Sequence, residues 1–172
     1  HGSSPKYYHK IMGGNFRLDT LQAAVVNIKL KYLENWTSSR QKNAARYNDL
    51  FKKSGLVDLT KDDGSRISSG YPIVLPLVRK GNRHIYNQYI IRALKRDELR
   101  KFLSDNEIGT EIYYPLPLHL QECYAYLGHK EGDFPHAEKA AEETLALPIF
   151  PELTAVQQAY VVSKIEEFYE NG

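Results

Sequence analysis

Residues 19–55, DTLQAAVVNIKLKYLENWTSSRQKNAARYNDLFKKSG, carry the longest helical pattern of the chain and set its architecture. Asp19, followed by Gln22 three residues later, is typical of a helix start at which polar side chains satisfy free backbone N–H groups. Apolar residues then recur at spacings of three and four, which is the period of a helix. They form two stripes, the first of Leu21, Val25, Ile28, Tyr32 and Trp36 and the second of Ala44, Tyr47, Leu50 and Phe51.

The end of this predicted helix is also marked. Lys52 and Lys53 fall in its last turn, and Gly55 supplies the residue type that commonly follows a helix. Residues 37–39, Thr-Ser-Ser, allow a break. Because a 172-residue globule does not need so long a helix, we expect it to link two domains or to pack on a partner.

The following residues predict a small antiparallel sheet. Residues 71–78 are rich in Ile, Val and Leu, and two prolines among them favour a sheet edge. A turn at 80–83 separates them from residues 85–91, which alternate in part between apolar and polar. We therefore expect a β-hairpin over residues 71–91 and a further strand over residues 106–114.

Helices are predicted to cover this sheet. One begins at Asp97, one spans residues 120–127, and one spans residues 135–145 with proline in its first turn. Thr154 and Gln157 form a capping box for a last helix. The residues expected on its inner face are Val161, Ile165 and Phe168. The predicted class is α+β, a long helix followed by a small antiparallel sheet covered by helices.

Composition narrows the function classes. Hydrophobic residues make up 42% of the chain, which favours a packed core, and the net charge is only +2 with both signs mixed, which argues against a nucleic-acid surface. No apolar run is long enough for a bilayer, and no secretory leader opens the chain. A lone cysteine, Cys123, fits a reducing compartment, so we expect a cytoplasmic protein.

Sites of metal or nucleophile chemistry are not expected. The six histidines show no metal-ligand spacing. Cys123 lies in the apolar stretch 120–127 and is expected to be a core residue.

Two other segments could bind a ligand. Gly13-Gly14-Asn15 precedes a helix start, where a backbone can approach an anion, although a plain turn would look the same.

The second segment, residues 112–121 (IYYPLPLHLQ), combines two tyrosines, two prolines, a histidine and a glutamine at a predicted strand end. The prolines stiffen the loop and lower the entropic cost of presenting its side chains to a ligand. His119 could hydrogen-bond a ligand or move a proton, or it could simply begin a helix.

These segments also carry a family resemblance. Residues 13–24, 84–92, 109–119, 132–135 and 146–153 occur in the order and with the motifs of the DegT/DnrJ/EryC1/StrS family of PLP-dependent nucleotide-sugar aminotransferases. The chain resembles the C-terminal portion of such a protein. The resemblance implies a fold-type I aminotransferase in which a large domain holds PLP. Residues 1–54 would then be the end of that domain and the interdomain helix, and residues 55–172 a small C-terminal domain.

The resemblance also implies a homodimer whose active sites are built from both subunits. Asn15, with Gly14 beside it, would contact the PLP phosphate of the partner subunit. Tyr114, Tyr113 and His119 would lie near the nucleotide-sugar. The lysine that forms the Schiff base would lie upstream of this chain, so the isolated chain is expected to be inactive. At Gly14 many relatives carry an aromatic residue, which leaves any stacking contact there in doubt.

The activity that the resemblance implies is transfer of an amino group, usually from glutamate, to a nucleotide-linked keto-sugar. Two alternatives stay open. Some relatives are PLP-dependent sugar dehydratases or regulators, and the C-terminal domain could by itself be a non-catalytic dimerisation module. The residue at the Schiff-base position would distinguish them.

Overall fold

The computed structural model describes residues 16–59 and 70–171, so Asn15 and Gly14 lie outside the described residues. The chain divides into two compact units, His1–Asn35 and Trp36–Gly172. The prediction of domains at residues 1–54 and 55–172 concerns a longer protein and stays a prediction. In the part of the chain that is described, no helix combines the length and apolarity needed to cross a bilayer.

The first unit contains helix α1, Thr20–Leu30. Its predicted start is confirmed, because the Asp19 carboxylate accepts hydrogen bonds from the backbone N–H groups of Leu21 (2.8 Å) and Gln22 (3.3 Å). None of its residues is buried. The apolar stripe predicted from Leu21 to Ile28 is therefore exposed within this unit.

Helix α2, Leu33–Ser54, is the second half of the predicted long helix. The break lies at residues 31–32 and not at 37–39, so that part of the prediction is wrong. The Tyr32 N–H donates to the Lys29 carbonyl at 2.9 Å, which closes a tight turn before α2 begins. Thr37 is buried within α2, where packing outweighs its weak helix preference. Gly55 ends α2 with φ of 74°, as predicted.

The sheet has three antiparallel strands in the order β1-β2-β3: β1 Ile73–Val74, β2 Tyr89–Ala93 and β3 Thr144–Leu147. The proline-rich segment forms an edge strand, as predicted. Three details of the prediction are wrong. Both strands of the hairpin are shorter, residues 106–114 contribute only an isolated bridge between Glu111 and Ala146, and the third strand comes from residues expected to end a helix.

Helix α4, Pro135–Glu143, ends directly before this third strand, which begins at Thr144. The Thr144 hydroxyl donates to the Ala140 carbonyl (2.7 Å), which uses an acceptor at the end of the helix. The residues that follow then pair with β2, Ile91 opposite Leu145. The gain from burying Leu145 between partners distant in sequence overrides the local helical pattern.

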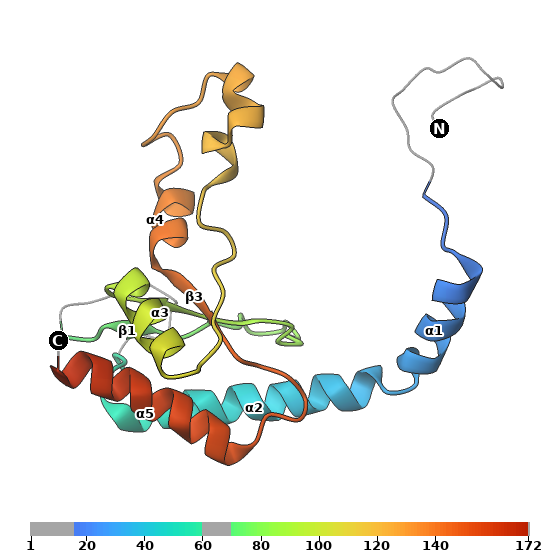
Figure 1. Ribbon diagram of the computed structural model, residues 1–172, viewed down its shortest axis with the longest axis horizontal. Helices are drawn as coiled ribbons and strands as arrows, with labels where there is room; N and C mark the ends of the chain where they lie inside the picture. The colour runs from blue at the N-terminus through green and yellow to red at the C-terminus, as the bar shows by residue number, and fades with distance from the viewer. Residues whose placement is uncertain (1–15, 60–69, 172) are drawn as a thin grey trace. The chain divides into compact units, whose positions relative to one another are not determined.

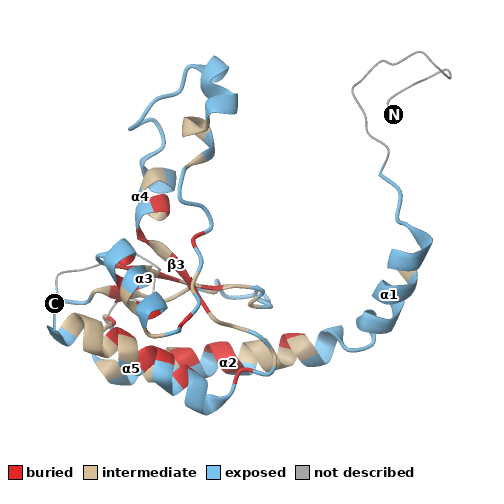
Figure 2. Cartoon of the chain, viewed as in Figure 1, coloured by how far each residue is buried: buried red, intermediate tan, exposed pale blue. Residues whose placement is uncertain are grey.

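The buried residues of β2 alternate along the strand and belong to the core, to which α2 also contributes buried residues (Figure 2). Helix α2 lies against the sheet (Figure 1). The rings of Tyr47 and Tyr89 lie 5.0 Å apart, and the Tyr89 hydroxyl donates to Asn48 at 2.7 Å. Burial raises the pKa of both tyrosine hydroxyls far above the ordinary value. Helix α5, Ala155–Asn171, lies beside α2 and is tied to it through Gln158, which is fully buried. Its amide donates to the Asn43 carbonyl and its oxygen accepts from Arg46, both at 2.8 Å.

Two further predictions about helices are confirmed. Helix α3, Arg96–Asp105, buries Leu99 and Leu103. The capping box ahead of α5 is formed, because the Thr154 N–H donates to Gln157 Oε1 at 2.9 Å and the Gln157 N–H donates to Thr154 Oγ1 at 3.2 Å.

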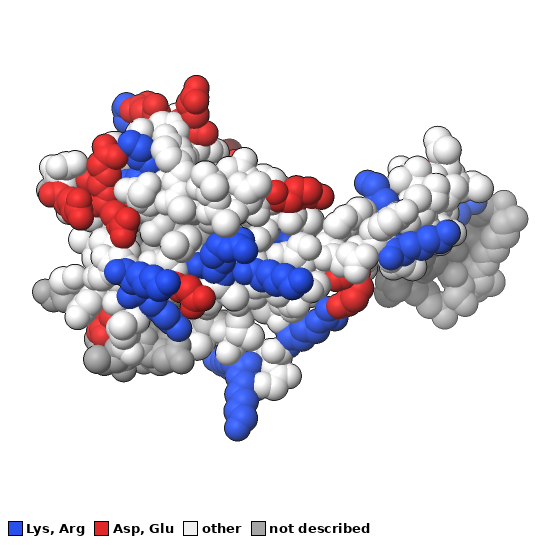
Figure 3. All heavy atoms as spheres, turned by 90° about the horizontal axis from the view of Figure 1, so that it is seen from below, with Lys and Arg blue, Asp and Glu red and all other residues white. Residues whose placement is uncertain are grey.

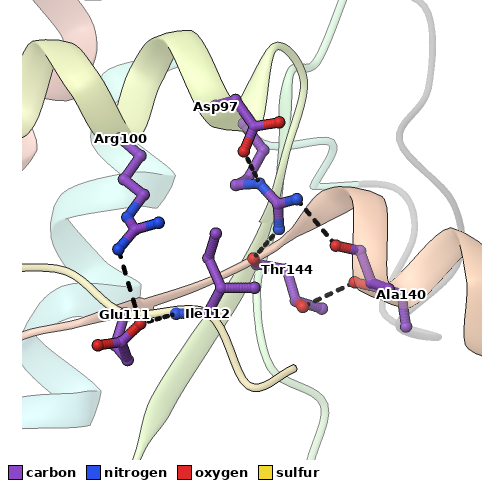
Figure 4. Close-up of polar contacts among 8 residues, drawn as sticks. Asp97, Arg100, Glu111, Ile112, Ala140 and Thr144 are labelled. Carbon is purple, nitrogen blue, oxygen red and sulfur yellow. Dashed lines mark hydrogen bonds and ion pairs between the residues drawn. The ribbon is translucent and has the colours of Figure 1, made fainter. Parts of the chain in front are cut away.

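Arg96, whose side chain is only 7% exposed, joins α3 to the junction of α4 and β3. Figure 4 shows two of its partners, Asp97 and Thr144. Its guanidinium donates to the carbonyls of Thr144 and Ala141, both at 2.8 Å, and to Asp97 Oδ1 at 2.7 Å. The carbonyls at a helix end lack partners within the helix, and here one side chain supplies them. Arg96 therefore fixes the direction in which α4 leaves the sheet.

The stretch predicted as a helix over residues 120–127 forms two short 3-10 helices, η1 Leu118–Leu120 and η2 Glu122–Leu127. They are separated by Gln121, whose backbone is extended. Such short turns bury none of their residues here, so the prediction that Cys123 is a core residue is wrong: it is exposed.

Candidate functional site

The most organised group of polar side chains outside the core surrounds His119. This residue lies in η1, and its side chain is 8% exposed. Its Nε2 is 2.8 Å from Oε1 of Glu138, in the first turn of α4, and its ring packs on Phe134 with centroids 4.8 Å apart. The structure thus brings His119 together with two residues that sequence reasoning did not single out.

Glu138 is itself fixed by the backbone that enters α4. Its carboxylate accepts hydrogen bonds from the N–H of Gly132 at 2.9 Å and from the N–H of Phe134 at 3.2 Å. Burial acts to raise the pKa of Glu138, but the hydrogen bonds from Gly132, Phe134 and His119 outweigh it, so the pKa lies below its usual value. Glu138 is therefore an ionised carboxylate near neutral pH.

The geometry defines the role of each nitrogen of His119. An ionised carboxylate only accepts hydrogen bonds, so Nε2 of His119 must be the donor to Glu138. In the neutral ring, Nδ1 is then the atom that can accept a hydrogen bond or a proton from a ligand. A histidine oriented in this way by a carboxylate can hold a hydroxyl group or exchange a proton with it.

The shift at Glu138 predicts a pH dependence. Because its pKa is lowered in the folded chain, the stabilisation from its ionised form is complete above the ordinary carboxyl range and is lost as the pH falls through the lowered value, below about 4.5. In amide NMR spectra, the N–H signals of Gly132 and Phe134 should shift together in this acidic range. Glu138→Gln should remove that shift, and persistence of it in the variant would contradict the assignment.

Tyr113 and Tyr114 precede the histidine cluster in the chain and contact each other. Tyr113 is 41% exposed and Tyr114 is 72% exposed, and their rings make an edge contact at 5.9 Å. Tyr113 lines a cavity of about 330 Å³ beside β3, together with Asn87, Gln88 and Glu111. Of the three residues predicted near the nucleotide-sugar, the two tyrosines contact each other and His119 contacts Glu138.

Each lysine between residues 16 and 59 and between 70 and 171 is exposed or half-buried. Lys101, Lys139 and Lys164 form ion pairs with carboxylates one helical turn away. Within the same ranges, no group of His, Cys, Asp and Glu side chains could hold a metal ion.

Charge on the face seen in Figure 3 is mixed. Lys and Arg side chains lie beside Asp and Glu side chains there, and no extended surface of a single sign forms. This distribution agrees with the small net charge of +2. It gives this face none of the continuous basic footprint by which proteins hold nucleic acids.

One signal in the sequence could have indicated Glu138. An acidic residue in the first turn of a helix interacts favourably with the helix N-terminus, and Glu138 comes three residues after Pro135, which begins α4. That signal predicts a local role only. The contact with His119 joins residues 19 positions apart across an irregular segment, and no periodicity encodes it.

The sequence of the chain is similar to those of known proteins. The model of the DegT/DnrJ/EryC1/StrS aminotransferase family matches residues 1–166. A protein of Geobacillus stearothermophilus named pleiotropic regulatory protein is 49% identical over 171 residues, which are 99% of this chain and 42% of that protein. A dTDP-3-amino-3,4,6-trideoxy-alpha-D-glucose transaminase of Streptomyces venezuelae is 36% identical over 170 residues, covering 99% of this chain and 41% of the transaminase.

A solved structure shows the same similarity at the level of the fold. The crystal structure of DesV from S. venezuelae superposes with a TM-score of 0.77 at 36% identity, covering 98% of this chain and 41% of that one. The chain thus spans about two fifths of the length of these relatives.

Proposed function

Because the chain belongs to the DegT/DnrJ/EryC1/StrS aminotransferase family, we propose that it is the C-terminal part of a PLP-dependent enzyme that aminates a nucleotide-linked keto-sugar. The proposal is supported by a relative that is named as a transaminase of a dTDP-linked sugar and covers 99% of the chain. In this proposal glutamate is the amino donor, the enzyme is a cytoplasmic homodimer, and the chain alone is inactive.

The observation that carries the proposal is the contact between His119 and Glu138 at 2.8 Å. Glu138 holds the His119 ring in one orientation, which leaves Nδ1 to accept a hydrogen bond from a sugar hydroxyl. Tyr114 and Tyr113 are exposed and offer hydroxyl groups and ring faces. The chain's own contribution in this proposal is to bind and orient the sugar substrate.

PLP would be held mainly by the part of the enzyme that lies outside these 172 residues, including the lysine that bonds it. When bound, it supplies the electron sink for transfer of the amino group. From this chain, Asn15 and the adjacent Gly14 are proposed to contact the cofactor phosphate of the partner subunit. Backbone and amide donors ahead of a helix suit a phosphate group.

A second candidate function is regulation. It is favoured by the relative from Geobacillus stearothermophilus, which is 49% identical and is named a pleiotropic regulatory protein. In that case the full-length protein could retain the fold without turning over an amino donor. The two candidates differ in a single measurable property, glutamate-dependent amino transfer.

The full-length protein provides the test. We expect visible absorbance from bound PLP, loss of that absorbance on addition of glutamate, and amination of a keto-sugar nucleotide.

Asn15→Ala should weaken retention of PLP about tenfold during dialysis, since a hydrogen bond to a charged group is removed. Asn27→Ala, at an exposed position of α1, is the matched control. If the absorbance of bound PLP did not change on addition of glutamate, the regulatory function would be favoured. If Asn15→Ala retained PLP as well as the unchanged protein does, the proposed role of Asn15 would be refuted.

A further inference from the structure

Arg40, in α2, is an arginine whose stem lies against the core. Its side chain is half-buried, and Thr37 and Ala44, one turn away in each direction, are buried. Tyr47, seven residues further along the helix, is fully buried as well. Because residues three, four and seven positions apart share one face of a helix, Arg40 belongs to the face of α2 that packs on the core.

One atom of this side chain has no partner. Among residues 16–59 and 70–171, Nε of Arg40 is the only buried side-chain nitrogen or oxygen without a hydrogen-bond partner. No ion pair within these ranges includes Arg40. A guanidinium keeps its charge in proteins, and a buried donor on a charged group costs free energy when no acceptor faces it. Native proteins therefore supply an acceptor to nearly all such groups.

Arg96 shows what a buried guanidinium receives elsewhere in this fold. Its Nε donates to Oδ1 of Asp97 at 2.7 Å, and its terminal nitrogens donate to the carbonyls of Thr144 and Ala141. One carboxylate and two carbonyls thus face the three nitrogens of Arg96. Arg40 presents the same donors to the interior without the corresponding acceptors.

Neither α2 nor the segment after β3 supplies the acceptor. Ion pairs along a helix join residues three or four positions apart. The residues at these distances from Arg40 are not acidic: Trp36, Thr37, Asn43 and Ala44. After β3, the Phe150 carbonyl accepts from Asn43 at 2.8 Å and the Pro148 carbonyl accepts from the Tyr47 hydroxyl at 3.1 Å. The neighbours of Arg40 on its helix face therefore use these carbonyls.

The acceptor that best suits Arg40 is a carboxylate. Nε and one terminal nitrogen of a guanidinium donate in parallel, which matches the two oxygens of a carboxylate, and buried charges in proteins are normally paired. Among the anions that fit this fork, a carboxylate is the one that a polypeptide carries. The chain spans about two fifths of the length of the relatives it matches, so the larger part of such a protein lies outside the matched region.

We infer that Arg40 forms an ion pair with an aspartate or glutamate in the part of the protein that lies outside these 172 residues. This contact fixes the core-facing side of α2 to the rest of the protein. The inference rests on the proposed function only in that the chain is part of a longer protein. It requires neither PLP nor amino transfer, so a full-length protein that transfers no amino group would refute the proposed function and not this ion pair.

Cross-linking in the full-length protein identifies the acceptor. Arg40→Lys replaces the guanidinium by an amine, which a water-soluble carbodiimide joins to a carboxylate in contact with it. After digestion, mass spectrometry should find position 40 linked to an acidic residue outside residues 1–172. Ala45→Lys places the same amine at an exposed position of α2 and is the matched control, which should not give this link.

Melting temperatures provide the second readout. Arg40→Met keeps the apolar stem and removes the donors. In the 172-residue chain this change should leave Tm unchanged or raise it, because a buried donor without an acceptor is lost. In the full-length protein it should lower Tm by about 3 °C or more, because a carboxylate then loses its partner. Lys42→Met removes an exposed charge from the same helix and should change neither Tm.

The other outcomes would overturn the inference. A link from position 40 to Asp19 or Glu34 would place the acceptor within this chain, and the absence of any link would leave Arg40 without a carboxylate in contact. Equal changes of Tm in the 172-residue chain and in the full-length protein would assign Arg40 to the packing of this chain alone. If Arg40→Lys failed to fold, the two melting temperatures of Arg40→Met would decide by themselves.

Discussion

Replacing Arg96 by methionine is expected to lower the free energy of unfolding by about 3 kcal/mol, since hydrogen bonds from a charged donor are removed and buried acceptors are left. Methionine keeps the apolar stem but removes the donors to the carbonyls of Thr144 and Ala141, which lie at the end of α4. Urea unfolding followed by circular dichroism measures the change. The site should loosen as well, because α4 carries Glu138.

Arg100 provides the matched control for this prediction (Figure 4). It belongs to the same helix, but its side chain is 45% exposed and its ion pair with Glu111 is 3.7 Å long. Arg100→Met should therefore cost less than about 1 kcal/mol. Arg96→Lys keeps the charge but not the planar fork, so it should remain strongly destabilised. Similar losses at Arg96 and Arg100 would show that the buried position is not special.

In the full-length enzyme, His119→Ala is expected to raise KM for the nucleotide-sugar about tenfold or more, while PLP retention stays unchanged. The physical reason is loss of an oriented hydrogen-bonding group from the substrate side. Steady-state kinetics with the sugar varied at saturating glutamate measures it. His129→Ala is a suitable control, because His129 also contacts Phe134 but is more exposed. An unaltered KM would remove His119 from the substrate site.

Glu138 is proposed to act through His119 as a positioning residue. Glu138→Gln can still accept a hydrogen bond from His119, but it no longer stabilises a positive charge on the ring. We expect its effect to appear as a changed pH profile of kcat/KM, with a smaller rise in KM than in His119→Ala. If Glu138→Gln changed only thermal stability, the contact would be structural alone.

The parts of the fold that could be predicted are those decided by neighbours in sequence. Asp19 caps α1, Gly55 ends α2, and Thr154 with Gln157 caps α5, each through contacts within three residues or through the backbone freedom of glycine. The helical stripe that carries Tyr47 and Phe51 was also recognisable, because its period follows from helix geometry.

The errors have a common physical origin in contacts between distant residues. The strand that contains Leu145 forms because β2, more than 50 positions earlier, offers a free edge. No pattern within residues 120–127 predicts that the helix is interrupted at Gln121 and that Cys123 is exposed. The local sequence pattern favours a helix or a strand, and contacts with distant residues then decide whether that element forms.

The candidate site divides in the same way. His119 and the two tyrosines stood out because residues 112–121 combine stiff prolines with ring-bearing and hydrogen-bonding side chains. Glu138 could not be paired with His119, since their contact crosses an irregular segment whose path follows from the direction of α4. That direction depends in turn on Arg96, which no motif connects with the site.

The order of the strands has a consequence for how the protein is made. The central strand β2 is synthesised long before β3, and the edge that pairs with β3 lacks its partner until residues 144–147 are available. A nascent chain halted before that point would leave this edge of β2 open to pairing with other chains. Folding on the ribosome should therefore be late, and ribosome-bound chains of increasing length should gain protease resistance only once residues 144–147 have left the ribosome.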